Sequence, residues 1–428
     1  MMDAAAAEDI PHHRADIERI PYVGVGVVSQ THQPAAMAVA VSEVLDDDDL
    51  LREILVRVGF PTSLVCAALT CKRWYQHASD RKFLDRFRER HPPCLLGFYV
   101  DIWTDPTAVP RFFPVLPQPT ELDAICHRAS FSLDTLDLSI VTEIIGCLNG
   151  SVLVSFESSN FTAGVHSPLH PERGLSVIPP SPPMNLVDGY SFSWMQLLTK
   201  EEGDGLSYIE LSVGCNKVRT KSMVNVDTLA NGDVVWRRHL TLATDQFIAA
   251  RWEPKAVLAD DKIYIPSATS DIFILDLTAS SISRSHLPQG VEYCNGDSKL
   301  ARADDASGLY LVHAKELQLR IWLHKAGNWL LTNTICLRDM VANLIMPGCK
   351  IEGEPTAPLR MHHVGDYAEF FILEMGGCAL YLDIKYKKLH KLHDMTATEQ
   401  YFGEIHPFMM IWPPKFPVLK NDPPRNAK

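Results

Sequence analysis

Long apolar runs are missing from this sequence. Its 428 residues are 46% apolar and 21% charged, the composition of a folded globular protein. The most apolar early stretch, residues 20–28, is interrupted by Pro21, Gly24 and Gly26, and no segment approaches the roughly 20 residues of a membrane-spanning helix. The amino terminus also has neither the basic region nor the apolar core of a secretory signal. We therefore expect an intracellular protein of the cytoplasm or nucleus, without a membrane partner.

Positively charged residues are also fewer than negatively charged ones. Lys and Arg total 40 against 52 Asp and Glu, which gives a formal net charge of −12. A chain this acidic gains little from neutralising phosphates, so nucleic acid is not an expected partner.

Paired cysteines and catalytic motifs are absent as well. The ten cysteines form no Cys-x-x-Cys pair and no Cys/His cluster at zinc spacing, so we expect buried, reduced thiols. The sequence motifs of zinc proteases, serine hydrolases and phosphate-binding loops do not occur. His362-His363 and His390-x-x-His393 suggest metal ligands, but paired strand or surface histidines are the simpler interpretation. We predict no catalytic residue, no cofactor and no metal.

A helical pattern begins near residue 44. Asp46–Asp49 precede an apolar run, where carboxylates cap a helix and meet the positive end of its dipole. The following apolar positions share one stripe of period 3.6: Leu50, Leu51, Ile54, Leu55 and Val58.

Further short helices are predicted after this first one. Gly59-Phe60-Pro61 ends the first helix, and Thr62 or Ser63 is expected to cap the second. A third begins around residue 71 and a fourth at Asp80. Three or four short helices bury too little apolar surface to be stable alone, so this module is expected to need a partner.

Beyond residue 90 the apolar residues alternate with period two, which predicts strands. Tight-turn dipeptides such as Asn149-Gly150, Asn231-Gly232 and Asn295-Gly296 separate them. A weak repeat groups the strands into blocks of the length of a propeller blade: 142–180, 190–242, 252–288, 298–338 and 358–393. Strands within 95–116 and 408–419 are predicted to build a sixth blade and close the ring.

The predicted organisation is therefore multidomain α+β. We expect a disordered tail over 1–40, a helical module over 41–90, a large all-β domain over 91–420 that folds as a six-bladed β-propeller, and a tail over 421–428. Five or seven blades remain alternatives.

The helical segment resembles an F-box. The resemblance rests on Leu45-Asp46-Asp47-Asp48-Asp49-Leu50-Leu51-Arg52-Glu53-Ile54-Leu55-Val56-Arg57-Val58, then Ser63-Leu64-Val65, Cys71-Lys72-Arg73-Trp74 and Ser79-Asp80-x-x-Phe83-Leu84. An F-box followed by propeller-like repeats is similar to the plant F-box families with a kelch-like or F-box-associated carboxy-terminal domain.

This resemblance implies a non-catalytic substrate receptor of an SCF-type cullin-RING ubiquitin ligase. The F-box would bind an SKP-type adaptor, which bridges to the cullin, and the β domain would hold a protein substrate. The residues that the resemblance assigns to adaptor binding are Leu45, Leu50, Leu51, Ile54, Leu55, Val58, Pro61, Leu64, Val65 and Trp74.

Two departures from the family pattern stand out. Asp46 occupies the position where Pro is usual, so a looser lead-in to the first helix is expected, and Ala67 and Ala68 stand where bulkier side chains are common. A non-degradative scaffold that binds the adaptor remains an alternative. A propeller enzyme or lectin with an incidental helical cap is the less favoured one.

Overall fold

The structure is a computed structural model of the whole chain. It describes residues 41, 43–91, 94–104, 107–115, 120–133, 141–156, 162–182, 190–202, 205–218, 220–245, 255–267, 270–293, 296–303, 308–344, 359–365, 368–396, 399, 401–414 and 416. Both predicted tails, 1–40 and 421–428, lie outside these residues. In the described part, no helix combines the length and apolar character needed to cross a membrane.

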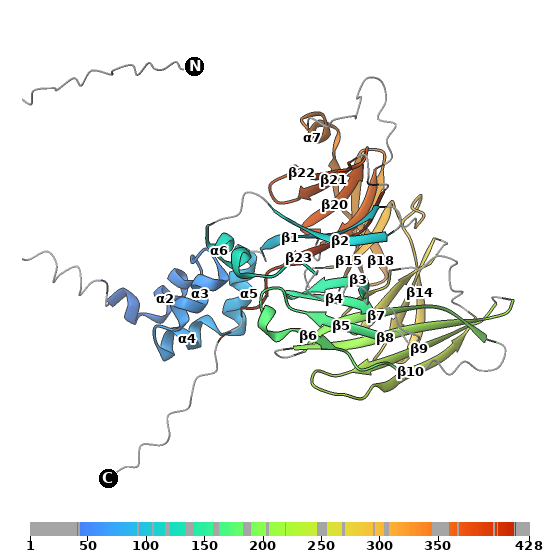
Figure 1. Cartoon of the computed structure of the whole chain (residues 1–428), viewed down its shortest axis with the longest axis horizontal. Coiled ribbons are helices and arrows are strands. Elements are labelled where there is room, and N and C mark those ends of the chain that lie inside the picture. Colours follow the sequence, from blue (N-terminus) through green and yellow to red (C-terminus); the bar gives the residue numbers. More distant parts are fainter. Residues whose placement is uncertain are drawn as a thin grey trace, which may run out of the picture.

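Four short helices form a bundle at one side of a large β domain (Figure 1). They are α2 (Asp48–Leu55), α3 (Pro61–Ala68), α4 (Lys72–Ala78) and α5 (Arg81–Arg90). As predicted, the acidic run starts the first of them: the Asp47 carboxylate accepts the backbone N–H groups of Asp49 and Leu50, both at 2.9 Å. Asp80 caps α5 in the same way through the N–H of Phe83.

The start of α3 differs from the expectation. Neither Thr62 nor Ser63 caps this helix; Phe60 is the N-cap residue and provides no side-chain hydrogen bond. Pro61 stands at the first helical position, where its fixed φ suits the helix and its missing N–H costs nothing. Pro61 therefore favours the start of this helix, in place of the hydroxyl cap that the sequence suggested.

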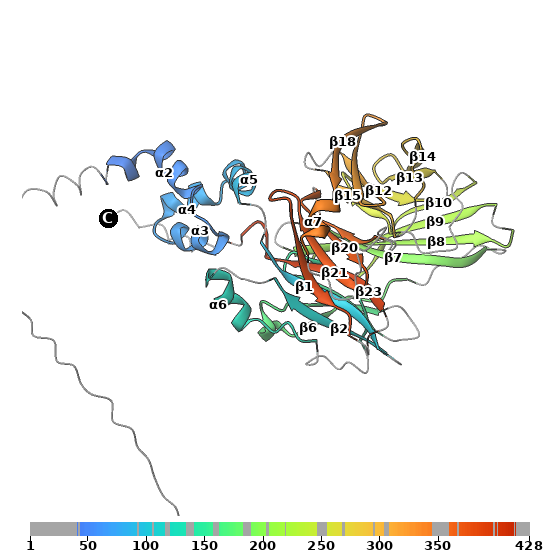
Figure 2. The same ribbon diagram turned by 90° about the horizontal axis from the view of Figure 1, so that it is seen from above.

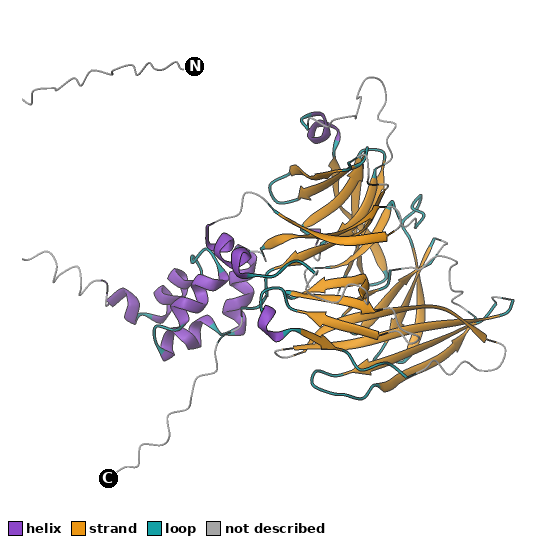
Figure 3. Cartoon of the chain, in the orientation of Figure 1, coloured by secondary structure: helices purple, strands orange, loops and turns teal. Residues whose placement is uncertain are grey.

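The β domain is a ring of six antiparallel sheets, as predicted (Figures 1 and 3). Five sheets have four strands that follow one another in the chain. They are β3 (Val141–Leu148), β4 (Ser151–Phe156), β5 (Thr162–His166) and β6 (Leu175–Val177); β7 (Tyr190–Glu202), β8 (Gly205–Asn216), β9 (Ser222–Leu229) and β10 (Arg237–Thr244); β11 (Val257–Ala259), β12 (Lys262–Pro266), β13 (Asp271–Asp276) and β14 (Ser281–His286); β15 (Ser298–Arg302), β16 (Leu309–Lys315), β17 (Gln318–Lys325) and β18 (Asn328–Cys336); and β19 (Arg360–Val364), β20 (Phe370–Met375), β21 (Cys378–Asp383) and β22 (Lys388–Asp394).

The sixth sheet joins both ends of the β domain. Its strand order is β2-β1-β23, where β1 is Leu95–Thr104, β2 is Thr107–Pro114 and β23 is Tyr401–Met409. Closure by both ends was predicted, but the placement of the last strand over 408–419 was wrong. The strand ends at Met409, and residues 410–414 leave the sheet. Closure removes the free sheet edges that an open arc of blades would expose.

Short helical segments connect some of these strands. They are α6 (Thr120–Arg128) between β2 and β3, the 3₁₀ turn η1 (Pro171–Arg173) between β5 and β6, and α7 (Arg338–Ala342) after β18.

Tight turns set the register within the blades. The predicted Asn149-Gly150 turn joins β3 to β4 with positive φ at both residues, 49° and 72°, as a type I′ hairpin requires. Asn231-Gly232 differs, because it lies in a longer connection between β9 and β10 and only the glycine has positive φ. Asn295 lies outside the described residues. Asp260-Asp261, which carries no glycine, also has positive φ at both residues and joins β11 to β12.

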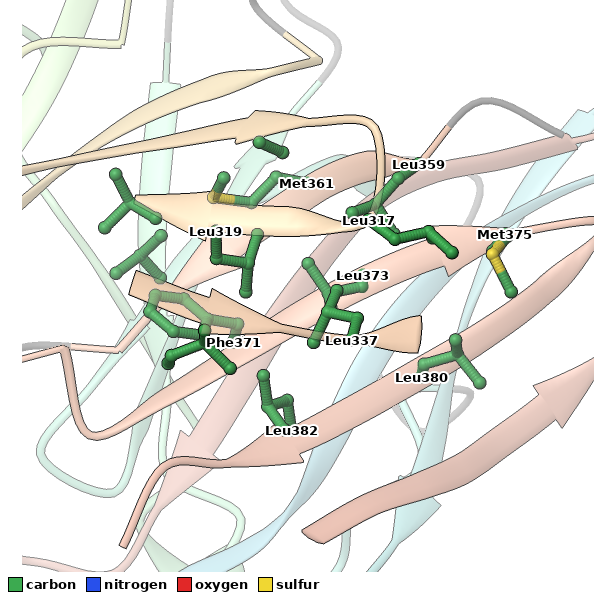
Figure 4. Close-up of a cluster of buried hydrophobic side chains, with 14 of the residues drawn as sticks. Leu317, Leu319, Leu337, Leu359, Met361, Phe371, Leu373, Met375, Leu380 and Leu382 are labelled. Atoms are coloured by element: carbon green, nitrogen blue, oxygen red, sulfur yellow. The ribbon is translucent and has the colours of Figure 1, made fainter. Parts of the chain in front are cut away.

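The core of the β domain lies between neighbouring blades. Figure 4 shows the largest apolar cluster, in which Leu319 of β17, Leu337, and Phe371 and Leu382 of the next blade are fully buried. Each fully buried Leu or Phe side chain of this kind contributes about 1.5–3 kcal/mol of transfer free energy. Blade-on-blade packing thus holds the ring together.

The thiol prediction is partly wrong. The eight cysteines in the described residues are free, but Cys66, Cys71 and Cys336 are exposed, and only Cys215 and Cys378 are buried.

Candidate functional site

The helical bundle encloses a small core of its own. Leu51 and Leu55 of α2, Leu64 of α3 and Phe87 of α5 are fully buried there. Pro61 is buried as well. Of the residues assigned to adaptor binding, Leu51, Leu55 and Leu64 therefore lie in this core in the free chain.

A second set of apolar side chains lies on the surface of the bundle. Leu50 and Ile54 are 45% and 38% exposed, and because they are four residues apart they share one side of α2. That side is turned about 100° from the side that carries the buried Leu51 and Leu55. Leu45, Val58, Val65 and Trp74 are partly buried. The sequence reading missed three further exposed apolar residues on the bundle: Val41, Val44 and Leu69.

Arg73 of α4 holds the segment that leads into α2. Its guanidinium donates to the backbone oxygens of Leu45 and Asp46, both at 2.6 Å, and to the Asp48 carboxylate at 2.7 and 2.8 Å. The looser lead-in expected from Asp46 is therefore not observed. Residues 43–46 are helical, and the arginine provides the restraint that a proline would otherwise give.

The surface ion pairs of the bundle keep its acids ionised. The hydrogen bond from Arg73, helped by His77, lowers the pKa of Asp48. His77 Nδ1 accepts from Arg52 Nε at 3.2 Å, so its Nε2–H donates to Asp48 at 3.0 Å. These pairs satisfy the charges on the side of α2 that carries Asp48 and Arg52, away from Leu50 and Ile54.

The carboxy-terminal segment of the chain returns to the helical bundle after β23. The Trp412 ring stacks on Phe87 of α5, with centroids 5.8 Å apart and an interplanar angle of 11°. Phe416 meets Tyr75 of α4 edge to face at 5.7 Å. Both aromatic residues pack against the buried cluster of the bundle. The partner that this small core was expected to need is thus partly supplied by the same chain.

Two further contacts fix this segment on the β domain. The Trp412 N–H donates to the Asn149 side-chain oxygen at 2.9 Å, within the β3–β4 turn. Ile411 covers Gly150, where a Cβ would lie 2.6 Å from Ile411 Cγ1. Phe60, between α2 and α3, packs against the cluster formed around β1 and β23. The bundle is thereby held against one end of the ring.

Sequence reasoning missed this contact because it placed residues 408–419 in a strand. The usable signal was the composition of that segment, Ile411-Trp412-Pro413-Pro414. Two consecutive prolines argue against a continued strand and leave the aromatic ring free for another contact.

A cavity of about 400 Å³ occupies the axis of the ring. Its walls come from the inner strands of the blades, β3, β7, β11, β15, β19 and β23, of which neighbours contact one another around the axis. Arg88 of α5 and Trp412 also line it, so this end of the axis is the one next to the helical bundle. Figure 2 shows the bundle on that side of the ring.

Several charged residues lie on or next to strands of the ring, close in the chain to residues that line this cavity. Lys255 forms an ion pair with Glu404 of β23, which brings together two blades on different sides of the axis. Burial, with Glu404 and Glu143 nearby, raises the pKa of Asp101 to about 7. Burial opposes ionisation of Glu404, yet Lys255 and His406 lower its pKa.

The histidine pairs suggested as metal ligands have other partners. His362 Nε2 lies 2.7 Å from a Glu374 oxygen, and His393 Nε2 lies 2.9 Å from Glu399. Within the part of the chain that the structure describes, no three His, Cys, Asp or Glu side chains gather as a metal ion would require.

Comparison with known families gives two matches. Residues 47–86 match the F-box domain, and residues 143–416 match the family described as F-box protein AT5G49610-like, beta-propeller. The chain belongs to this F-box protein family. The expected combination of an F-box with a six-bladed propeller of the plant F-box type is confirmed, and an F-box implies binding of an SKP-type adaptor. The domain limits 41–90 and 91–420 contain both matches but stay predictions.

Similarity to individual proteins is slight. No curated protein matches the sequence. A Bacteroides thetaiotaomicron protein of unknown function is 12% identical with a TM-score of 0.35, the match covering 64% of this F-box protein and 61% of that chain. An α-L-arabinofuranosidase of Fusarium graminearum is 12% identical with a TM-score of 0.34, over 60% of this chain and 80% of that one. This F-box protein therefore spans less than two thirds of the first of these structures, and likenesses of this size carry no argument.

Proposed function

We propose that this F-box protein is a non-catalytic substrate receptor of an SCF-type cullin-RING ubiquitin ligase. Its F-box would bind an SKP-type adaptor and, through it, the cullin. Its propeller would hold a protein substrate. This function requires an intracellular chain.

The exposed pair Leu50 and Ile54 supports the adaptor contact most directly. A small bundle that buries Leu51 and Leu55 and still leaves these two apolar neighbours in solvent has a surface that a partner would cover. The full set of residues from Leu45 to Trp74 stays a proposal as adaptor contacts.

The packing of Trp412 and Phe416 determines how this proposal is tested. Because these residues complete the F-box core, the full chain is the appropriate protein, rather than residues 40–90 alone. The test is co-purification of the full chain with an SKP-type adaptor, comparing the wild type with a Leu50→Asp/Ile54→Asp variant. Each aspartate would place an unpaired charge in an apolar contact, so we expect adaptor binding to be lost.

A matched control comes from the propeller. Val234 and Val235 are 76% and 66% exposed, and Val234→Asp/Val235→Asp should retain adaptor binding. Retention in the Leu50→Asp/Ile54→Asp variant, with circular dichroism unchanged, would show that the adaptor binds elsewhere. Once binding is established, ubiquitylation of a co-purified protein separates a receptor from a non-degradative scaffold.

A further inference from the structure

Each blade has an outermost strand whose outer edge pairs with no other strand in the described part of the chain (Figure 2). Such an edge presents N–H and C=O groups that can pair with another chain. Proteins usually prevent this with charged residues, with prolines or by keeping the strand very short. The outermost strands are β2, β6, β10, β14, β18 and β22, and they differ in these protections.

All of these strands except β18 carry at least one such protection. β2 contains two prolines and an arginine, and β6 has only three residues. β10 contains two arginines, β14 contains one, and β22 contains two lysines and an aspartate. β18 has nine residues, and none of them is charged or a proline. It is therefore the least protected outer edge of the ring.

β18 also exposes apolar side chains. Leu330 and Leu331 are each 55% exposed, and because they are consecutive they point to opposite faces of the sheet. Trp329, in contrast, donates its indole N–H to the His286 carbonyl at 2.8 Å and so packs against the neighbouring blade. The edge of β18 thus lies between two exposed leucines, which favours pairing with another strand.

The one irregularity in β18 fits a two-fold contact. The register of β18 on β17 shifts at Thr332, opposite Ile321 and Trp322. Similar shifts occur in β10 and β22, which carry charged residues as well. Thr332 divides β18 into two segments of equal length, 328–331 and 333–336. A two-fold axis at Thr332 would pair each segment with the other segment of an antiparallel copy, so that Leu331 lies opposite Asn333 of that copy.

The charges next to the strand also suit an antiparallel copy. The nearest charged residue before β18 is Lys325, and the nearest after it are Arg338 and Asp339, which balance each other. An antiparallel copy would place the Lys325 end beside this neutral end, whereas a parallel copy would bring two lysines together. The buried F-box cluster contains no residue of this blade, so pairing through β18 covers none of that cluster.

We propose that β18 pairs with β18 of a second copy of this chain. Two four-stranded blades then join into one eight-stranded antiparallel sheet. The contact is closed, because each copy uses its β18 edge once. This inference goes beyond the proposed function, since the contact does not involve the adaptor. The resulting dimer carries two F-boxes and two propellers.

The mass of the full chain in solution tests this proposal. Light scattering after size-exclusion chromatography should give twice the 47.9 kDa of one chain. Leu331→Lys/Asn333→Lys should give the single-chain mass, because the lysines would face each other across the two-fold axis. The matched control is Ser281→Lys/Ser283→Lys, at two exposed residues of the outermost strand β14, which should keep the doubled mass.

A mixture of variants separates strand pairing from misfolding. Leu331→Glu/Asn333→Glu alone should also have the single-chain mass. An equal mixture of the glutamate and lysine variants should recover the doubled mass, since opposite charges then face each other. A wild type that keeps the single-chain mass up to about 100 μM would overturn the proposal. So would a mixture that stays at the single-chain mass, a doubled mass in either charge variant alone, or its loss in the β14 control.

Discussion

The F-box and the propeller differ in how each one fills its core. The propeller packs blade on blade around a closed ring, and Phe371, Leu373 and Leu380 are fully buried in a cluster that contains no residue of the F-box helices. The F-box core needs Trp412 and Phe416, which arrive from the far end of the chain. A small helical module can thus be part of a larger domain's core even when its sequence motif is self-contained.

The two regions also differ in the burial of their carboxylates and in the direction of the pKa shifts. F-box acids such as Asp48 and Glu53 sit at the surface beside arginines, which lower their pKa values. In the propeller, Asp101 is 8% exposed and its pKa is raised. Exposed ion pairs such as those of Asp48 and Glu53 contribute little to the free energy of unfolding. A buried carboxylate, in contrast, makes that free energy depend strongly on pH.

The largest expected effect comes from breaking the closing sheet. Phe408 on β23 is fully buried and packs against the rings of Tyr99, Phe112 and Phe131. Phe408→Ala should lower the free energy of unfolding by about 3–5 kcal/mol, measured by urea denaturation. Phe192→Ala, at a residue 55% exposed, should change it by less than about 0.5 kcal/mol. Similar losses in both variants would contradict closure through β23.

The pH dependence of stability distinguishes the buried carboxylate of the propeller from the exposed carboxylates of the F-box. The folded-state pKa of Asp101 lies above its ordinary value, so the folded state holds the proton more strongly and wild-type stability falls as pH rises from about 4 to about 7. Asp101→Asn should therefore stabilise the protein above pH 7, by on the order of 3 kcal/mol, with the gain shrinking toward pH 4. Thermal unfolding across pH measures this.

The control is an acid of the F-box. Asp48→Asn removes a carboxylate whose pKa is lowered, so it should give no gain above pH 7. A gain that stayed constant from pH 4 to pH 8 in Asp101→Asn would show that the carboxyl is not buried in its ionised form.

The third effect is smaller and local. Trp412→Ala removes the stack on Phe87 and should destabilise the F-box by about 2 kcal/mol. Hydrogen exchange should quicken at the amides of α4 and α5, while the blades keep their protection. Trp329→Ala, at a tryptophan of β18 that donates to the His286 carbonyl, should alter its own blade instead. Unchanged exchange in α5 would mean that the carboxy-terminal segment does not support the F-box.

The sequence sufficed for features set by local patterns. The acid-capped stripe of α2 and the alternation within the blades each reflect a single element, and both predictions are confirmed. The closing strand was misplaced because residues 408–419 are as apolar as a strand, and only the tertiary contacts with Phe87 and Tyr75 show where Trp412 and Phe416 pack.

The candidate sites were less accessible from the sequence. The spacing of Leu50, Leu51, Ile54 and Leu55 defines one apolar stripe, but which pair faces the core depends on how α2 sits on its neighbours. The ion pair between Lys255 and Glu404 has no sequence signature, because the two residues are 149 positions apart in the chain and meet only when the ring closes.

The placement of the chain's entry and exit has a further consequence. The β domain begins at Leu95, just after α5, and its last strand ends at Met409, just before Trp412 contacts α5. The F-box is therefore attached at two points to the same blade. A single linker would let the propeller swing through a cone of orientations, and any molecule bound to the propeller would be diluted over that volume. Two attachments would keep such a molecule at a nearly constant distance from whatever binds the F-box, so its effective concentration there would be set by the chain itself.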